Sequence, residues 1–225
     1  MKKNLLIICL FVLISNAYSI DIKKYQIKSG IIEYRIEGMS NGTEIVYFDD
    51  YGIKEARFTK TEAKIMGFTT TVNTITITDK DWSYNINLDE KTGTKMKNKQ
   101  LQELLDGITQ KDYEEFGKKM LEQMDAKHIG NETILGKSCE VWDIRKMNGK
   151  TWNYKYVPLK IEINMLGTNT TTAIKFEENA KIPSDKFQVP KGITITEQEM
   201  ENMNMDDMFK ILQKGIEEEG NESEK

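Results

Sequence analysis

Most of this chain alternates apolar and polar residues with a period of two. The alternation is clearest over 30–37, 82–89 and 159–165, where every second residue is apolar. A period of two places alternate side chains on opposite faces of a β-strand. Asn-Gly and Asp-rich turns over 40–42, 49–52 and 146–150 separate such segments. The pattern predicts an antiparallel sheet built from hairpins, with one apolar and one polar face.

Two regions change to the spacing of an amphipathic helix. The first covers about 98–128 and predicts a helical insertion of two helices, with His128 at the end of the second. The second covers 196–216 and begins at a capping box, Thr196 to Glu199. Together with the strands, these helices predict a mainly β protein with helices, an α+β fold.

Both ends of the chain differ from the predicted domain over 20–195. Residues 1–19 contain two lysines, a short apolar run and small residues, which is the pattern of a secretory signal peptide. The apolar run is about half of the roughly 20 residues that a membrane span needs, so we expect no transmembrane segment in the mature chain. The acidic tail, 217–225, has the composition of a disordered segment.

Charge and cysteine content narrow the possibilities further. The net charge is −4, and lysines alternate with acidic residues along the chain. This mixture is typical of a solvated surface and does not predict a nucleic-acid partner. Cys139 is the only cysteine after residue 19, so an intramolecular disulfide is not expected and the apolar core must supply the stability.

The region after Glu132 carries one family resemblance. Its motifs occur in this order: 134–142 (ILGKSCEVW), Trp152, 158–160 (PLK) and 187–192 (FQVPKG). Together they resemble the C-terminal half of the LolA/LolB-like superfamily, periplasmic proteins related to outer-membrane lipoprotein sorting. The resemblance implies an antiparallel open half-barrel around a hydrophobic cavity, with helices across or beside its mouth. No functional residue of that family coincides with a motif position here.

The sequence predicts no catalytic residue, metal site or cofactor. His128 is the only histidine, and a triad would need a nucleophile and an orienting acid beside it. Cys139 lies on the apolar face of a predicted strand, where a buried structural role is typical. No His/Cys group has the spacing of a zinc site. We therefore expect a protein that is not an enzyme.

Candidate ligand contacts come from three groups. The predicted cavity lining consists of inward-facing strand residues, for which ordinary core packing is the alternative: Tyr34, Ile36, Phe58, Trp82, Tyr84, Ile86, Trp152, Tyr154 and Tyr156. Arg35, Arg57 and Arg145 are possible headgroup or lid contacts, although cross-strand pairing with glutamate explains them more simply. The face of the C-terminal helix is a possible lid, with core packing again as the alternative: Met200, Met203, Met208, Ile211 and Leu212.

These features predict a periplasmic, non-enzymatic carrier or chaperone that binds a lipid or a lipoprotein acyl chain. The alternative is a cell-envelope protein-interaction module. Such a module would bind a protein partner through the Met-rich C-terminal helix or through an open edge of the sheet.

Overall fold

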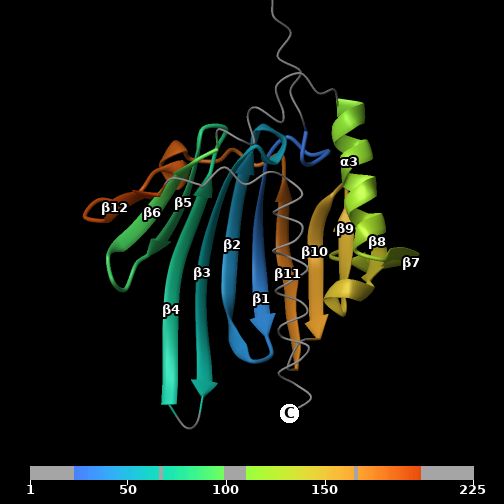
Figure 1. Cartoon of the computed structure of the whole chain (residues 1–225), viewed down its shortest axis with the longest axis horizontal. Helices are drawn as coiled ribbons and strands as arrows, with labels where there is room; N and C mark the ends of the chain where they lie inside the picture. Colours follow the sequence, from blue (N-terminus) through green and yellow to red (C-terminus); the bar gives the residue numbers. More distant parts are fainter. Residues whose placement is uncertain (1–22, 66–67, 99–109, 165–166, 199–225) are drawn as a thin grey trace, which may run out of the picture.

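The computed structural model describes residues 23–65, 68–98, 110–164 and 167–198. These residues form one sheet of 12 strands (Figure 1). The strands in chain order are β1 (Gly30–Glu37), β2 (Ser40–Asp49), β3 (Lys54–Ile65), β4 (Phe68–Thr78), β5 (Trp82–Asn87), β6 (Thr92–Lys97), β7 (Ala126–Ile134), β8 (Lys137–Ile144), β9 (Gly149–Tyr154), β10 (Val157–Asn164), β11 (Thr168–Glu178) and β12 (Thr194–Gln198). The helical elements of this part of the chain are α3 (Gln110–Gln123) and the 3₁₀ turns η1 (Asp50–Gly52), η2 (Arg145–Met147) and η3 (Ser184–Phe187).

Two antiparallel meanders make up the sheet. Across the sheet the order is β12-β6-β5-β4-β3-β2-β1-β11-β10-β9-β8-β7. The first meander runs from β1 to β6 and the second from β7 to β11, and antiparallel pairing of β1 with β11 joins them. β12 returns to the far edge and pairs parallel with β6. β12 and β7 are the two ends of this order, so the sheet is open.

The structure contradicts the predicted α+β fold class. The described residues are nearly all β, with one short helix, and none of them forms a helix across the mouth of the sheet. α3 contacts β7, at one end of the sheet (Figure 1). The physical reason is that extended chain covers both apolar faces: the segment before β1 packs Tyr25 and Ile27 onto the inner face, and β12 with the chain leading to it covers the outer face of β3 to β5.

The boundaries of the predicted helices also change. α3 confirms a helix within the predicted insertion, but His128 lies in β7 rather than at a helix end. Residues 99–109 lie outside the described residues. Thr196 does not begin a helix, because Thr194–Gln198 form β12. Ile193 and Ile195 alternate with threonines there, which is a strand period, and pairing with β6 makes this segment a strand.

The first hydrophobic core lies on β1, β2 and β8 to β11. Its buried residues come from both meanders and from the segment before β1: Tyr25, Ile27, Ile32, Tyr34, Val46, Phe48, Cys139, Val141, Trp152, Val157, Leu159 and Ala173. Tyr25 packs edge-on against Phe48, with ring centroids 5.0 Å apart. Gly52 leaves room for the Tyr25 ring, because a Cβ at Gly52 would lie 2.4 Å from it. The segment before β1 is therefore built into the core.

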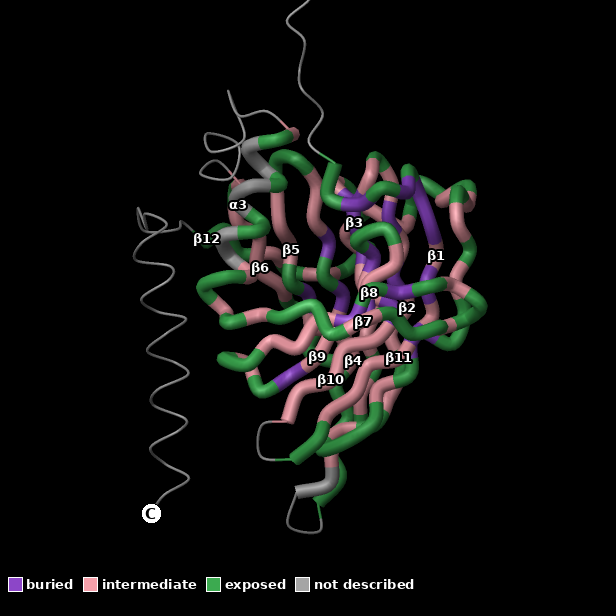
Figure 2. The backbone as a smooth tube through the Cα atoms, turned by 90° about the vertical axis from the view of Figure 1, so that its right-hand side faces the viewer, coloured by how far each residue is buried: buried purple, intermediate pink, exposed green. Residues whose placement is uncertain are grey.

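The second hydrophobic core covers the other face of the first meander. Ala56, Ile75, Ile77 and Ile86 are buried there. Residues of β12 and of the chain leading to it pack against them, including Phe187, Val189, Ile193 and Ile195. Figure 2 shows that buried positions gather toward the end of the sheet where the segment before β1 lies, while the opposite hairpin ends are mostly half-buried or exposed.

Phe48 supports the first core, and replacing it tests this packing. The Phe48 side chain is fully buried, so Phe48→Ala should lower the free energy of unfolding by about 3–5 kcal/mol. Phe68, at 78% exposure, supplies the matched control, and Phe68→Ala should change stability by less than about 0.5 kcal/mol. Urea unfolding followed by tryptophan fluorescence measures both, and equal losses would contradict this core.

Candidate functional site

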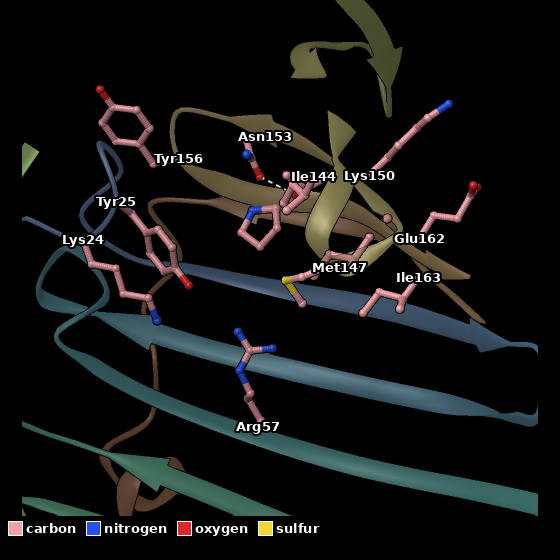
Figure 3. Close-up of a pocket in the computed structure, with 14 residues that line it drawn as sticks. Lys24, Tyr25, Arg57, Ile144, Met147, Lys150, Asn153, Tyr156, Glu162 and Ile163 are labelled. Carbon is pink, nitrogen blue, oxygen red and sulfur yellow. Dashed lines mark hydrogen bonds between the residues drawn. The ribbon is translucent and has the colours of Figure 1, made fainter. Parts of the chain in front are cut away.

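A pocket of about 420 Å³ lies between β3, the β8 to β10 region and the segment before β1 (Figure 3). The lining residues are Lys24, Tyr25, Arg57, Ile144, Met147, Gly149, Lys150, Thr151, Asn153, Tyr156, Pro158, Ile161, Glu162 and Ile163. This volume falls within the range of about 300–1,000 Å³ that is usual for small-molecule sites.

Curling of the sheet creates the pocket. Arg57 is on β3 and Thr151 is on β9, and four strands lie between them in the sheet. Neighbouring strands are about 4.8 Å apart, so a flat sheet would separate β3 from β9 by about 24 Å. Because both residues line one pocket of modest volume, the sheet must bend the two walls toward each other.

One wall of the pocket is apolar. Ile161 and Ile163 alternate along β10 with Lys160 and Glu162, which places the two isoleucines on one face. Ile144 at the end of β8 and Met147 of η2 also line the pocket. Ile161 and Ile163 are half-buried, so a ligand that covered them would remove apolar surface from water.

The other end of the pocket holds a network of charged side chains centred on Arg57. The Arg57 Nε donates to Glu55 Oε1 at 2.6 Å, and Nη1 donates to Glu44 Oε1 at 2.9 Å. Lys24 Nζ lies 3.0 Å from Glu55 Oε2, and the Tyr25 hydroxyl donates to the same oxygen at 2.7 Å. The network therefore ties the segment before β1 to β2 and β3.

These contacts fix the protonation states in the network. Burial by itself would raise the pKa of Glu55, but the charges of Lys24 and Arg57 and the hydrogen bonds from Tyr25 and Lys24 lower this pKa overall. Burial would lower the pKa of Arg57, yet the carboxylates of Glu55 and Glu44 raise it. The pKa of the buried Tyr25 hydroxyl is raised, first by desolvation and then by Glu55. Glu55 is thus a carboxylate and Arg57 a cation at neutral pH.

Of the predicted ligand contacts that lie within the described residues, Tyr156 and Arg57 line this pocket. Tyr34 and Trp152 are buried in the first core, and Tyr154 packs against it. Tyr34 still supports the pocket, because its hydroxyl donates to the Pro158 carbonyl at 2.6 Å.

The aromatic residues predicted on the first meander mostly face the other way. Phe58, Tyr84 and Ile86 belong to the second core. Trp82 stands beside Lys95, whose Nζ lies 4.4 Å from the ring centroid. Ile36 is half-buried in β1, in the same cross-strand row as Ile161 but outside the pocket lining.

The other two arginines make ion pairs away from the pocket. Arg35 Nε lies 3.0 Å from Glu37, and both side chains are exposed. Arg145 lies 3.6 Å from Asp125 and 3.7 Å from Asp143. The Met-rich segment that was predicted as a lid, with Met200, Met203, Met208, Ile211 and Leu212, lies outside the described residues, so the lid stays a prediction.

Sequence reasoning missed most of the pocket lining. Ile161 and Ile163 were recognised as a strand face but not as ligand contacts, and their alternation with charged residues was the available signal. Lys24 and Met147 come from a short lead-in and a turn, where periodicity carries no information about neighbours. Only the curled sheet brings these four residues to one pocket.

His128 and Cys139 do not come together. The His128 ring lies 5.3 Å from the Trp142 ring, at the β7–β8 pairing. Cys139 is fully buried in the first core. Within the described ranges, no group of three or more His, Cys, Asp or Glu side chains could hold a metal ion. The described part of the chain also contains no helix of the length and apolarity needed to cross a bilayer.

Comparisons with known proteins give structural likeness only. No protein-family model matches this chain, and no curated protein matches it in sequence. The resemblance to LolA/LolB-like proteins thus stays a prediction. One similar solved structure is an uncharacterized conserved protein from Thermus thermophilus, with TM-score 0.46 and 9% identity over 79% of this chain and 95% of that one. Another is PNGF-II, with TM-score 0.39 and 14% identity over 77% of this chain and 32% of that one.

The charged network predicts a specific loss of stability in acid. Because the pKa of Glu55 is lower in the folded protein than in the unfolded chain, ionised Glu55 contributes to the free energy of unfolding. This contribution is complete above the unfolded glutamate pKa of about 4.3. It disappears as pH falls through the folded-state pKa of Glu55. The stability difference between the wild type and Glu55→Gln should therefore shrink as pH falls from about 5 to about 3, measured by urea unfolding. Tyr25→Phe removes one hydrogen bond that lowers this pKa, so in that variant the acid-dependent loss should be smaller and should be complete at a higher pH. A difference that stayed constant would contradict the network.

Cys139 should be inert in the folded protein. Burial raises the pKa of its thiol and excludes reagents, outweighing a backbone hydrogen bond that lowers the pKa. Reaction with a chromogenic disulfide reagent should be slow in buffer and immediate in guanidinium chloride, where unfolding exposes the thiol. Rapid labelling of native protein would show that this position is open.

Proposed function

We propose that this chain is a periplasmic, non-enzymatic carrier that holds the acyl chain of a lipid or lipoprotein between β3 and the β9–β10 hairpin. The observation that carries the proposal is the half-buried apolar wall of a pocket of about 420 Å³. Four apolar side chains line that wall: Ile144, Met147, Ile161 and Ile163. A ligand with an alkyl chain would complete the burial of this wall.

The energetic argument rests on apolar transfer. Each CH₂ group that leaves water for an apolar site contributes about 0.8 kcal/mol. An alkyl chain therefore gains affinity in proportion to the length that the pocket accepts, without any specific hydrogen bond. The signal-peptide pattern of residues 1–19 supports the periplasmic location in this proposal.

An envelope protein-interaction module is the second candidate, and the edge of the sheet favours it. Among the described strands β7 pairs only with β8, so its outer edge offers nine residues of backbone. Most β7 residues are exposed, and Ile129 is 52% exposed. Such an edge can add a strand from a partner protein.

Alkyl-chain binding is tested with saturated fatty alcohols of increasing length in a fluorescent-probe displacement assay. Affinity should rise about fourfold for each added CH₂ until the pocket is full. Ile163→Trp should fill the pocket and weaken binding. Ile174→Trp is the matched control, because Ile174 is 46% exposed on β11 and does not line the pocket.

Two results would contradict the carrier proposal. One is an affinity that does not depend on alkyl length, since burial in an apolar pocket requires that dependence. The other is equal binding by Ile163→Trp and Ile174→Trp, which would place the alkyl chain elsewhere on the molecule.

A further inference from the structure

We propose that Arg57 makes the pocket selective for amphiphiles with an anionic head group. The head would lie at the end formed by Lys24, Tyr25 and Arg57, and the alkyl chain would run along Ile161 and Ile163. This inference rests on the proposed carrier function and adds the chemical class of the ligand.

The pocket has a polar end and an apolar wall. In Figure 3, Lys24 and Tyr25 lie on the left and Arg57 in the centre of the view, and Met147 and Ile163 lie to the right of them. The strand register gives the scale of this separation. The line of paired residues that crosses the sheet from Ile161 reaches β3 at Thr61, which is four residues from Arg57. At about 3.3 Å per residue along β3, the Ile161 level of the sheet is about 13 Å from the Arg57 level.

Arg57 keeps donors available for a ligand. Within the described residues its Nε and Nη1 bind Glu55 and Glu44, and no hydrogen bond there uses Nη2. Every fully buried side-chain nitrogen or oxygen in that part of the chain has a hydrogen-bond partner, so Nη2 must be accessible. The Arg57 side chain is 31% exposed, and the residue lines the pocket. A planar guanidinium held in this way is suited to an oxyanion.

Available donors, rather than net charge, favour an anion at the Arg57 end. Among the described lining residues Lys24, Arg57 and Lys150 are cations and Glu162 is a carboxylate. Glu44 and Glu55 lie outside the lining and pair with Arg57 and Lys24, so the positive charges at this end are balanced. The carboxylates orient the guanidinium, and Arg57 Nη2 together with the Lys24 ammonium offers donors that an anionic head group can accept and a cationic head group cannot.

Three probes with the same alkyl chain test the inference on the intact protein: tetradecanoate, tetradecanol and tetradecyltrimethylammonium, each below its micelle concentration. The wild type should bind tetradecanoate at least about tenfold more tightly than tetradecanol, as one charge-assisted hydrogen bond predicts. The ammonium probe should bind more weakly than the alcohol. Arg57→Gln should remove the preference for the acid and leave the affinity for the alcohol within about twofold. Arg35→Gln, outside the pocket, should keep the wild-type preference.

Folding must be separated from recognition in this test. Arg57→Gln leaves Glu44 and Glu55 without their cation, so the double variant Glu44→Gln/Arg57→Gln removes one carboxylate as well. Thermal unfolding identifies which variant is folded at the assay temperature. If a folded variant kept the acid preference, the role of Arg57 would be overturned.

The wild type alone also decides the question without any variant. Equal affinity for tetradecanoate and tetradecanol would overturn head-group selection while leaving the carrier function intact. Binding of none of the three probes would overturn the carrier function itself.

Discussion

The pairing of β1 with β11 is the interaction on which the rest of this structure depends. It joins strands that lie about 140 residues apart in sequence, and eight residue pairs form its ladder. Without it, the β1–β6 and β7–β11 meanders would be separate sheets, and the first core, which takes residues from both, would be split. The same pairing brings β3 and β9 to the two sides of one pocket, because the sheet between them bends. A register shift between Glu33 and Tyr34 interrupts the ladder, and such bulges increase local twist.

The charged network shows how a site can be built beside a core. Arg57 lies on the same face of the first meander as Val46 and Phe48, which are buried. A charge at such a position is tolerated only when partners compensate it. Glu44 and Glu55 do so from the same face of β2 and β3, and Lys24 and Tyr25 complete the arrangement from the chain before β1. Stability and ligand selectivity would then depend on the same few side chains.

The two faces of the first meander have opposite roles. Phe58, Tyr84 and Ile86 pack beneath the returning chain around Phe187 and Ile195, whereas Arg57 faces the pocket. Phe58 and Tyr84 are therefore structural, and the pocket takes its apolar wall from β8 to β10. An open sheet whose end strand β7 pairs with no described strand other than β8 remains compatible with binding either an alkyl chain or a partner strand.

The sequence alone determined the strands that alternate clearly, such as β1, β5 and β10, because period-two alternation and turn residues are local properties of the chain. It predicted turns at 49–52 and 146–150, and the structure has the 3₁₀ turns η1 and η2 at these places. It also predicted that Ile161 and Ile163 lie on one face of a strand. It could not say which face of a strand meets which partner, since alternation defines two faces and assigns neither to the core. That assignment placed Tyr84 in a core and Arg57 in a pocket. The capping box at Thr196 predicted a helix, but this segment pairs with β6 as a strand. The sequence could not predict that pairing, because backbone hydrogen bonds to a distant strand are a tertiary property. The pocket belongs to the same category: Lys24, Arg57 and Ile163 are far apart in sequence, and only the curl of the completed sheet brings them together.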